Sequence, residues 1–469
     1  MDLTHPKHIH LIGIGGAGMG PIADILFHQG HHITGSDPNQ NTMTQHLHSL
    51  GINIYPTHQA DNITDADIIV TSTAIPRHNP EVVAAQKANI PVIPRAQMLA
   101  ALMTTKDGIA VAGTHGKTTT TSLLACLLTE AGLDPTYVIG GLLQSTGSNA
   151  GIGQSKLFVA EADESDASFL HLHPKMAIVT NIDADHMETY GDNFDRLCDT
   201  FVQFLHQLPE DGLAVLCIDD PVIRKLIPQI KRPILTYGFD ADADIRLMNY
   251  RPQGFHSQFT LIHTRDNHRL DITLNAPGEH NALNAAAAYA VAHTLGASDE
   301  AAQQALEKFA GVGRRMQVYG ELEIDSGKVL LIDDYGHHPR EISATWKALR
   351  QAWPGRRLVV AYQPHRYTRT RDLFNDFVDV LSDPNVQLIL LDIYSAGEAP
   401  ITGIDGPTLF EAIKNKSKHQ PIFVADINTL PSVLKEVLRE SDVLLTQGAG
   451  SVGRVAPQLQ AEGLCLISS

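Results

Sequence analysis

The feature that most constrains the fold is an apolar run that stops at a glycine and is followed at once by Gly-Lys-Thr. Residues 109–121 read IAVAGTHGKTTTT. The apolar run predicts a buried strand, and the residues after the loop, TTTTSLLACLL, predict a helix. Such a loop suits a phosphate, because backbone amides and the positive end of the helix dipole face the same point. The stretch therefore predicts an α/β sheet with a phosphate site at its edge, but it does not fix the chemistry.

This loop keeps the parts of a nucleotide-binding loop but not the whole pattern. The usual motif has a glycine at the position that Val111 occupies, and Gly113 lies two residues later. Lys117 is placed to reach the β- and γ-phosphates of a nucleotide, and the Thr118 hydroxyl to bind Mg²⁺. A structural turn that happens to read GKT is the alternative. The buried strand before it and the helix after it favour the phosphate site.

A second glycine loop opens the chain. HIHLIGIGG predicts a strand that enters a turn, and Gly13, Gly15 and Gly18 form GxGxxG before a helix. The geometry suits a diphosphate, with Asp37 after the next strand placed near a ribose hydroxyl. From these residues alone three readings fit: NAD, another ligand with a ribose and a diphosphate such as a UDP-sugar, or a tight turn without a ligand.

Strands and helices alternate along the chain in three segments. Residues 1–102 and 313–469 each predict a doubly wound parallel sheet covered by helices. Residues 103–312 predict an α/β core in which polar and apolar residues alternate from about Leu235 to Asn275. This alternation is typical of antiparallel hairpins added to the core.

Composition excludes some partners and sets the expected compartment. The 469 residues carry a net charge of −17, which argues against nucleic acid as the main partner. The four cysteines are far apart and are expected to be reduced thiols in a cytoplasmic protein; they are Cys126, Cys198, Cys217 and Cys465. Neither a signal peptide nor an apolar run of membrane-spanning length is apparent, so we expect no membrane insertion.

Acidic side chains follow two of the buried strands in the central segment. They are Glu161, Asp163, Glu164 and Asp166 in EADESD, and Asp183 and Asp185 in NIDADH, where His186 comes next. Strand ends of such sheets open onto the ligand crevice, and Mg²⁺ prefers a few carboxylates together with phosphate oxygens. One acid and one histidine added to Thr118 could hold two ions around a triphosphate. Most of these carboxylates are expected to be solvated loop charges, and spacing alone does not select the ligands.

A basic cluster follows two strands of the third segment. DDYGHHPRE comes after one strand and YQPHRYTRTRD after the next, which brings Arg366, Arg369 and Arg371 close together. Arginine can hold a carboxylate or phosphate with two parallel hydrogen bonds. The alternative is a salt-bridged surface loop, but a basic cluster at a strand end in so acidic a chain favours an anion site.

Taken together, these motifs resemble those of the Mur ligases of peptidoglycan synthesis, in all three segments and over nearly the whole chain. They are GIGGAGMG, GTHGKTTTT, EADESDASF, TNIDADHMETY, PGEHNALNAAAA, GVGRRMQ, DDYGHHP and QPHRYTRT. The resemblance implies a Rossmann-like UDP-sugar-binding domain at 1–102 and a P-loop-type ATP-binding α/β domain with antiparallel additions at 103–312. It implies a second Rossmann-like domain at 313–469 that closes over the site. The first glycine loop is then a site for the diphosphate of UDP rather than of NAD.

The resemblance also implies roles for individual residues. The ATP site would comprise Gly113, Thr114, His115, Gly116, Lys117, Thr118 and Thr119, with Asn281 and Asn284 at adenine, Asp334 at the ribose and Arg315 at the γ-phosphate. The UDP-sugar site would comprise Gly15, Gly16, Ala17, Gly18, Met19, Asp37, Ser72, Thr73 and Asn79. The amino acid and the sugar carboxylate would meet Tyr335, His337, Arg366 and Arg369. The metal ligands would be Thr118, Glu161 and His186, and the catalytic residues Lys117, Glu161, His186 and Arg315.

The reaction that the resemblance implies joins L-alanine to the lactyl carboxylate of UDP-N-acetylmuramate through an acyl phosphate, with ATP and two Mg²⁺ ions. GIGGAGMG, EADESDASF and DDYGHHP favour this member, acting as a monomer or weak homodimer. A recycling relative that attaches a murein tripeptide tends to carry EADEYD and DDFAHHP instead. A dehydrogenase would leave GTHGKT and the arginines without a role, and a nucleotide-gated binding protein would leave the acids and arginines unexplained.

Overall fold

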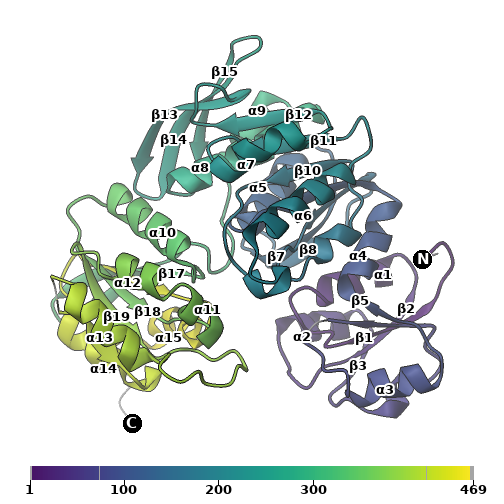
Figure 1. The fold of residues 1–469 in the computed structure, drawn as a ribbon, viewed down its shortest axis with the longest axis horizontal. Helices are drawn as coiled ribbons and strands as arrows, with labels where there is room; N and C mark the ends of the chain where they lie inside the picture. Colours follow the sequence, from purple (N-terminus) through teal and green to yellow (C-terminus); the bar gives the residue numbers. More distant parts are fainter. Residues whose placement is uncertain (1–2, 73, 419, 465–469) are drawn as a thin grey trace. The chain divides into compact units, whose positions relative to one another are not determined.

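The computed structural model describes residues 3–72, 74–418 and 420–464. Its strands form three sheets, which is the predicted three-domain α/β architecture. By contacts the chain divides into two compact units (Figure 1). Unit 1 comprises Met1–Met248, Leu261–Leu270 and Leu283–Leu306, and unit 2 comprises Asn249–Thr260, Asp271–Ala282 and Glu307–Ser469. The predicted boundaries at residues 102 and 312 remain predictions.

The first sheet is parallel throughout and lies in unit 1. In spatial order its strands are β3 (Asn53–Tyr55), β2 (His32–Ser36), β1 (His8–Ile12), β4 (Ile68–Thr71) and β5 (Val92–Pro94). The helices between them are α1 (Gly20–His28), α2 (Thr42–Ser49), α3 (Pro80–Lys87) and α4 (Arg95–Thr104). The strand order reverses direction between β1 and β4. The loops after these two strands therefore meet at the carboxyl edge, where ligands bind in open α/β sheets.

The second sheet has ten strands. In spatial order they are β15 (His268–Leu274), β14 (His256–His263), β13 (Ile245–Gln253), β12 (Ile234–Gly238), β11 (Leu213–Cys217), β10 (Met176–Val179), β6 (Asp107–Ala112), β9 (Leu157–Glu161), β7 (Thr136–Leu143) and β8 (Ser148–Gly151). The helices are α5 (Lys117–Glu130), α6 (Phe194–His206), α7 (Pro221–Leu226), α8 (Glu279–Thr294) and α9 (Asp299–Glu307). Strand β6, which leads into the GTHGKT loop, pairs in parallel with β10 and β9.

Two details of the second sheet differ from the sequence-based expectation. Strand β12 pairs in parallel with both β11 and β13, so the region expected to form hairpins begins with a parallel strand. Hairpins start only at β13 and β14, which two residues connect, too few for a parallel crossover. The antiparallel pair β7–β8 was not predicted. The sequence alternation reports which face is buried and not the strand direction, and this accounts for both differences.

The third sheet lies in unit 2 and is mixed. In spatial order its strands are β16 (Gln317–Ile324), β17 (Gly327–Asp334), β21 (Val443–Gln447), β18 (Leu358–Tyr362), β19 (Val386–Leu391) and β20 (Ile422–Val424). The predicted doubly wound sheet carries one further edge strand that the sequence did not indicate, where β16 pairs antiparallel with β17. Apolar and polar residues are interspersed in β16 and only Leu322 is buried, so its sequence lacks the continuous apolar run that marks the other strands.

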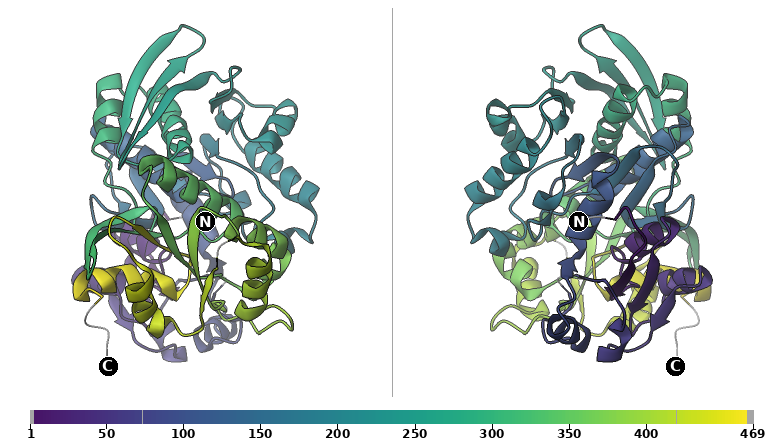
Figure 2. Two further views of the ribbon diagram at one scale, coloured as in Figure 1. Left: turned by 90° about the vertical axis from the view of Figure 1, so that its left-hand side faces the viewer. Right: turned by 90° about the vertical axis from the view of Figure 1, so that its right-hand side faces the viewer.

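Helices cover both faces of this third sheet, which explains its apolar central strands. Buried residues of α10 (Pro339–Ala352), α12 (Phe374–Leu381) and α13 (Gly406–Lys416) form one core cluster with the sheet. Those of α14 (Leu430–Val437) and α15 (Val455–Glu462) form the cluster on the other face. Figure 2 shows these green and yellow helices from two further sides. The remaining α-helix is α11 (Tyr367–Asp372), and the 3-10 helices are Ala60–Ile63, Ser168–His171, Met187–Tyr190, Ile227–Gln229, Ile427–Thr429 and Ser451–Arg454.

Two global expectations can be compared with the described residues. Among them, no helix combines the length and apolar character needed to cross a membrane. Cys126, Cys198 and Cys217 carry free thiols, as expected, and Cys465 lies outside the described residues.

Candidate active site

The GTHGKT loop after β6 is built around two glycines that no other residue could replace without strain. Gly113 has a φ of +126°, and a Cβ atom there would lie 2.1 Å from Thr180 Oγ1. Gly116 has a φ of +84° at the start of α5, and a Cβ atom there would lie 2.7 Å from Asn284 Oδ1. The loop is therefore held closely between the end of β10 and helix α8.

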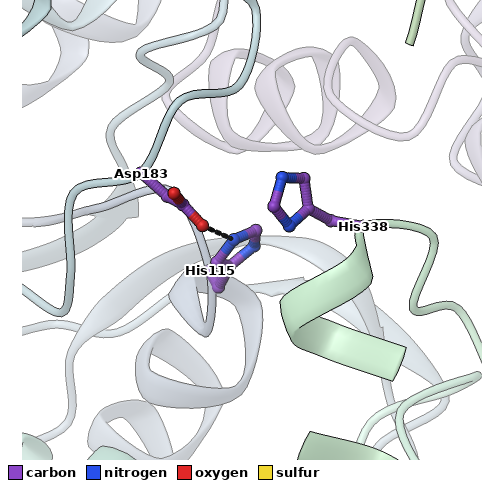
Figure 3. A group of neighbouring side chains, drawn as sticks. All are labelled: His115, Asp183 and His338. Atoms are coloured by element: carbon purple, nitrogen blue, oxygen red, sulfur yellow. Dashed lines mark hydrogen bonds and ion pairs between the residues drawn. The ribbon is translucent and has the colours of Figure 1, made fainter. Parts of the chain in front are cut away.

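Hydrogen bonds fix the middle of this loop to the segment that follows β10. The backbone N–H groups of Thr114 and His115 donate to the carbonyl and the side-chain oxygen of Asn181, at 3.0 and 2.9 Å. The Asp183 amide donates to Thr114 Oγ1 at 2.9 Å. His115 Nε2 lies 3.4 Å from Asp183 Oδ2, and Figure 3 shows this pair as a dashed line. These contacts set the loop in one conformation, as a phosphate site requires.

Lys117 lies beneath the loop and is surrounded by acceptors. Its ammonium donates to the Gly113 carbonyl at 2.7 Å and to both carboxylate oxygens of Glu164 at 2.9 and 2.7 Å. Burial alone would lower the pKa of Lys117, but the carboxylates of Glu164, Asp163 and Glu161 outweigh burial and raise it. Burial raises the pKa of Glu164 to about 7, although Lys117 opposes this shift. One lysine thus lies among three carboxylates; the pKa of Glu164 is raised, whereas Lys117 and a hydrogen bond from Ser165 lower that of Asp163 despite its burial.

Oxygen donors suited to a divalent cation lie beside Lys117. Thr118 Oγ1 donates to Glu161 Oε2 at 3.3 Å, and the Gly140 amide donates to Glu161 Oε1 at 2.6 Å. Mg²⁺ binds hydroxyl and carboxylate oxygens together with phosphate oxygens, so this pair fits it. His186 follows β10, with its Nε2 3.6 Å from Asp185 Oδ2. The structure brings Thr118 and Glu161 together, and a metal role for His186 remains a prediction.

The first glycine loop, between β1 and α1, is held by an aspartate. Asp37 Oδ2 accepts a hydrogen bond from the Gly15 amide at 2.9 Å, and Oδ1 accepts one from the Asn39 amide at 2.9 Å. The Asn41 side chain donates to the Gly15 carbonyl at 3.0 Å. Asp37 therefore fixes the loop in this structure, and its contact with a ribose remains a prediction. Gly16 and Ala17 are exposed, Gly18 is half-buried and Met19 is buried.

The segment after β4 was predicted to line the UDP-sugar site. The Ser72 carbonyl accepts from the Ile75 amide at 3.1 Å, and Ser72 is half-buried. Thr73 lies outside the described residues. Asn79 is buried, and its side-chain oxygen accepts from the Glu81 amide at 2.9 Å, which makes it the N-terminal cap of α3. This explains an asparagine before a proline without a ligand, since such caps stabilise helices.

In unit 2, Asp334 ends β17 as a fully hydrogen-bonded carboxylate. It accepts from the amides of Met316 and Gly336 at 3.0 and 2.9 Å, and from the side chains of Thr345 and Gln447 at 3.2 and 3.0 Å. These contacts favour a role in shaping the loop after β17. Asn281 is likewise buried, and its amide donates to the Pro277 carbonyl at 2.7 Å. Contacts of Asp334 and Asn281 with a nucleotide stay predictions.

Arg315 is held in place by two neighbours in the same unit. Its guanidinium lies 5.0 Å from the centre of the Tyr335 ring and within 3.6 Å of a Glu341 carboxylate oxygen. Arg314 lies on the same ring at 5.2 Å and donates to Asp333 at 2.9 Å. Tyr335 therefore positions both arginines, which is a role that the sequence did not suggest.

The second predicted group of unit 2 lies after β17 and β18. Arg366 has a φ of +73°, a conformation that non-glycine residues rarely adopt and that is often found at functional sites. The His365 ring stacks on Tyr394 at 5.6 Å and lies 5.8 Å from the His337 ring. Burial, together with Arg369 and Arg366, lowers the pKa of His365 to about 4. The structure thus places His337, Arg366 and Arg369 around one neutral histidine.

Three family models match the chain in order. They are the Mur ligase catalytic domain at residues 8–107, the Mur ligase middle domain at 111–292 and the Mur ligase glutamate ligase domain at 314–450. The chain belongs to the Mur ligase family. It is accordingly an ATP-dependent ligase of peptidoglycan precursors, and Mur ligases bind ATP and UDP-sugar substrates, typically with Mg²⁺.

Solved structures of Mur ligases align with two thirds or nearly all of the chain. A UDP-N-acetylmuramate–alanine ligase from Thermotoga maritima is 28% identical, covers 96% of this chain and 98% of its own, and has a TM-score of 0.80. A murein peptide ligase from Psychrobacter arcticus is 24% identical over 99% and 100%, with a TM-score of 0.70. A UDP-N-acetylmuramate:L-alanyl-γ-D-glutamyl-meso-diaminopimelate ligase from Neisseria meningitides is 29% identical over 66% and 100%, with a TM-score of 0.59.

In this Mur ligase the structure places two residues at the site that the sequence did not reveal. Glu164 was among the acids expected to be solvated, but it holds Lys117 with both oxygens. Asn181 was not singled out, yet it fixes the GTHGKT loop. Both residues closely follow buried strands, so their position at the carboxyl edge of the sheet could have indicated a role at the site. Their residue type could not, because acids and amides are common in exposed loops.

Proposed function

We propose that this Mur ligase joins L-alanine to the lactyl carboxylate of UDP-N-acetylmuramate at the expense of ATP. The observation that carries the proposal is the likeness to the Thermotoga maritima alanine ligase over almost the full length of both chains, with a TM-score of 0.80. The motifs EADESD and DDYGHHP point to the same member.

The chemistry explains why such a ligase needs a nucleotide. A carboxylate at neutral pH is a poor acyl donor, because its leaving group would be oxide. Transfer of the γ-phosphoryl group gives an acyl phosphate, whose leaving group is phosphate. The free amine of alanine then attacks the carbonyl carbon, and the tetrahedral intermediate collapses to the amide and phosphate. Both steps gather negative charge in one place, so the protein must supply fixed positive charge.

Lys117 and Arg315 are the proposed sources of that charge. Lys117 is kept protonated by the surrounding carboxylates and lies directly under the GTHGKT loop. Arg315 is always charged and is held by Tyr335 and Glu341. When bound at Thr118 and Glu161, Mg²⁺ would neutralise phosphate charge. Arg366 and Arg369 are proposed to bind the carboxylates of the amino acid and the sugar acid.

Phosphate release from ATP and Mg²⁺ would test the proposal, with UDP-N-acetylmuramate present and one amine added at a time. Release that depends strongly on L-alanine, with an amide product of matching mass, is the expected result. Stimulation by L-alanyl-γ-D-glutamyl-meso-diaminopimelate and not by alanine would move the chain to the recycling member of the family. That second candidate is favoured by the 29% identity to the Neisseria ligase. If no amine stimulates release, both assignments fail.

A further inference from the structure

Arg95 is a half-buried arginine beside the carboxyl edge of the first sheet. It is the first residue of α4, directly after β5, and 25% of its side chain is exposed. Its contact with another charged group is an ion pair of 3.9 Å with Asp163 Oδ2. In the part of the chain that the structure describes, its guanidinium donates no hydrogen bond. A guanidinium has five N–H groups, and those of Arg95 remain available to a ligand.

The guanidinium lies against the first glycine loop. A Cβ atom built on Gly18 would lie 3.1 Å from Arg95 Cδ and Nη1 and 3.3 Å from Cζ. Gly18 has an ordinary negative φ, so its lack of a side chain is explained by this close approach and not by the backbone. The arginine and the loop therefore fit each other at the carboxyl edge of the first sheet.

The loop itself offers donors at the same place. For the backbone N–H groups of Ala17 and Gly18, no acceptor is found within residues 3–72, 74–418 and 420–464. Ala17 is exposed and Gly18 half-buried, so both amides are accessible to a ligand. Two open amides beside an arginine form a set of donors that all favour an anion with several oxygens.

We propose that Arg95 binds the diphosphate of the sugar nucleotide, together with the amides of Ala17 and Gly18. The identity of the ligand rests on the proposed function, because UDP-N-acetylmuramate supplies the diphosphate. Asp163 Oδ2 lies 3.9 Å from Arg95 Nη2 and helps to orient the guanidinium. The lactyl carboxylate is the other anion of this substrate, but the diphosphate matches the glycine loop, whose amides recognise phosphate in open α/β sheets.

The test uses the full-length enzyme and its Arg95→Gln and Arg95→Lys variants. Binding of UDP-N-acetylmuramate and of UDP-N-acetylglucosamine is measured by calorimetry; the second ligand has the diphosphate but no lactyl carboxylate. We expect Arg95→Gln to weaken both by about 10- to 100-fold, the usual effect of losing hydrogen bonds to a charged group. Arg95→Lys keeps the charge but not the paired donors, so it should weaken both by a smaller factor.

Turnover gives a second readout, because the diphosphate is remote from the reacting carboxylate. The KM for UDP-N-acetylmuramate should rise about as much as the dissociation constant, with kcat changed by no more than about twofold. Arg265→Gln is the matched control, because it removes the same charge from an arginine that is 75% exposed and paired with Asp244. This control and the binding of ADP to every variant should match the wild type.

Each outcome decides between the assignments. If only the binding of UDP-N-acetylmuramate is weakened, Arg95 binds the lactyl carboxylate and the diphosphate assignment is overturned. Unchanged binding of both sugar nucleotides, or an equal loss for ADP, would overturn any specific role. If the wild type binds neither sugar nucleotide, the proposed function fails and the inference fails with it. Wild-type binding with unaffected variants refutes the inference alone.

Discussion

The pair of Glu164 and Lys117 leads to a prediction whose sign is opposite to the usual expectation for a salt bridge. Only 4% of the Glu164 side chain is exposed, and burial raises its pKa from 4.5 to about 7. Asp163 adds to this rise, and one lysine does not compensate for burial and repulsion together. The ionised carboxylate is therefore a cost to the fold, and Glu164→Gln should stabilise unit 1 at high pH.

The sign of the pH dependence follows from the number of protons that the folded and unfolded states bind. Between pH 4.5 and 7 the folded protein keeps a proton on Glu164 that the unfolded chain has released. The free energy of unfolding of the wild type therefore falls as pH rises through this window, by about 3 kcal/mol in total. Glutamine has the shape of the protonated acid and does not titrate. The variant should match the wild type near pH 4.5 and exceed it by about 3 kcal/mol at pH 8.

Scanning calorimetry of both proteins without nucleotide, at half-unit steps from pH 4.5 to 8, would measure this difference. The relevant transition is the one that ADP shifts upwards, since a ligand stabilises the unit that binds it. At roughly 2 °C per kcal/mol for a unit of this size, a gain of roughly 6 °C is expected at pH 8. Glu210→Gln, at an exposed position, should leave the pH profile unchanged. A difference between Glu164→Gln and wild type that stays constant with pH, or a less stable variant at pH 8, would refute the reasoning.

Three further predictions concern the loop and unit 2. Lys117→Ala should reduce amide formation by at least about 10³-fold while circular dichroism shows an intact fold, and a fast, folded variant would contradict its role. Gly113→Ala should destabilise unit 1 by about 3 kcal/mol in urea unfolding, because its Cβ would overlap Thr180 and its φ is unsuitable; a neutral effect would mean that the loop yields. His365 has a pKa near 4 when folded and 6.5 when unfolded. With a reduction for solvent screening of this half-buried ring, unit 2 should lose about 2 kcal/mol of stability as pH falls from 6.5 to 4. His365→Gln should flatten this loss, measured by urea unfolding at each pH.

Much of the architecture could be read from local sequence signals. Continuous apolar runs predict the buried parallel strands, such as β6 and β18, because a strand covered on both faces has no polar side. The GTHGKT and GIGGAGMG loops could be placed at strand ends because glycines punctuate a strand and a helix. What failed was the edge strand β16 and the direction of β12. An exposed edge has no continuous apolar run, and the alternation of side chains along a strand is the same in parallel and antiparallel pairing.

The candidate site divides in the same way. The sequence by itself determined which residues carry chemistry. Lys117 and Thr118 could be placed from the Gly-Lys-Thr motif, because a glycine loop and the first turn of a helix depend only on nearby residues. Only the tertiary structure decided what surrounds them. The partner of Lys117 is Glu164, 47 residues away, and the residue beside Gly18 is Arg95, at the start of α4. Burial and pKa depend on such distant neighbours, and the packing of strand ends brings them together.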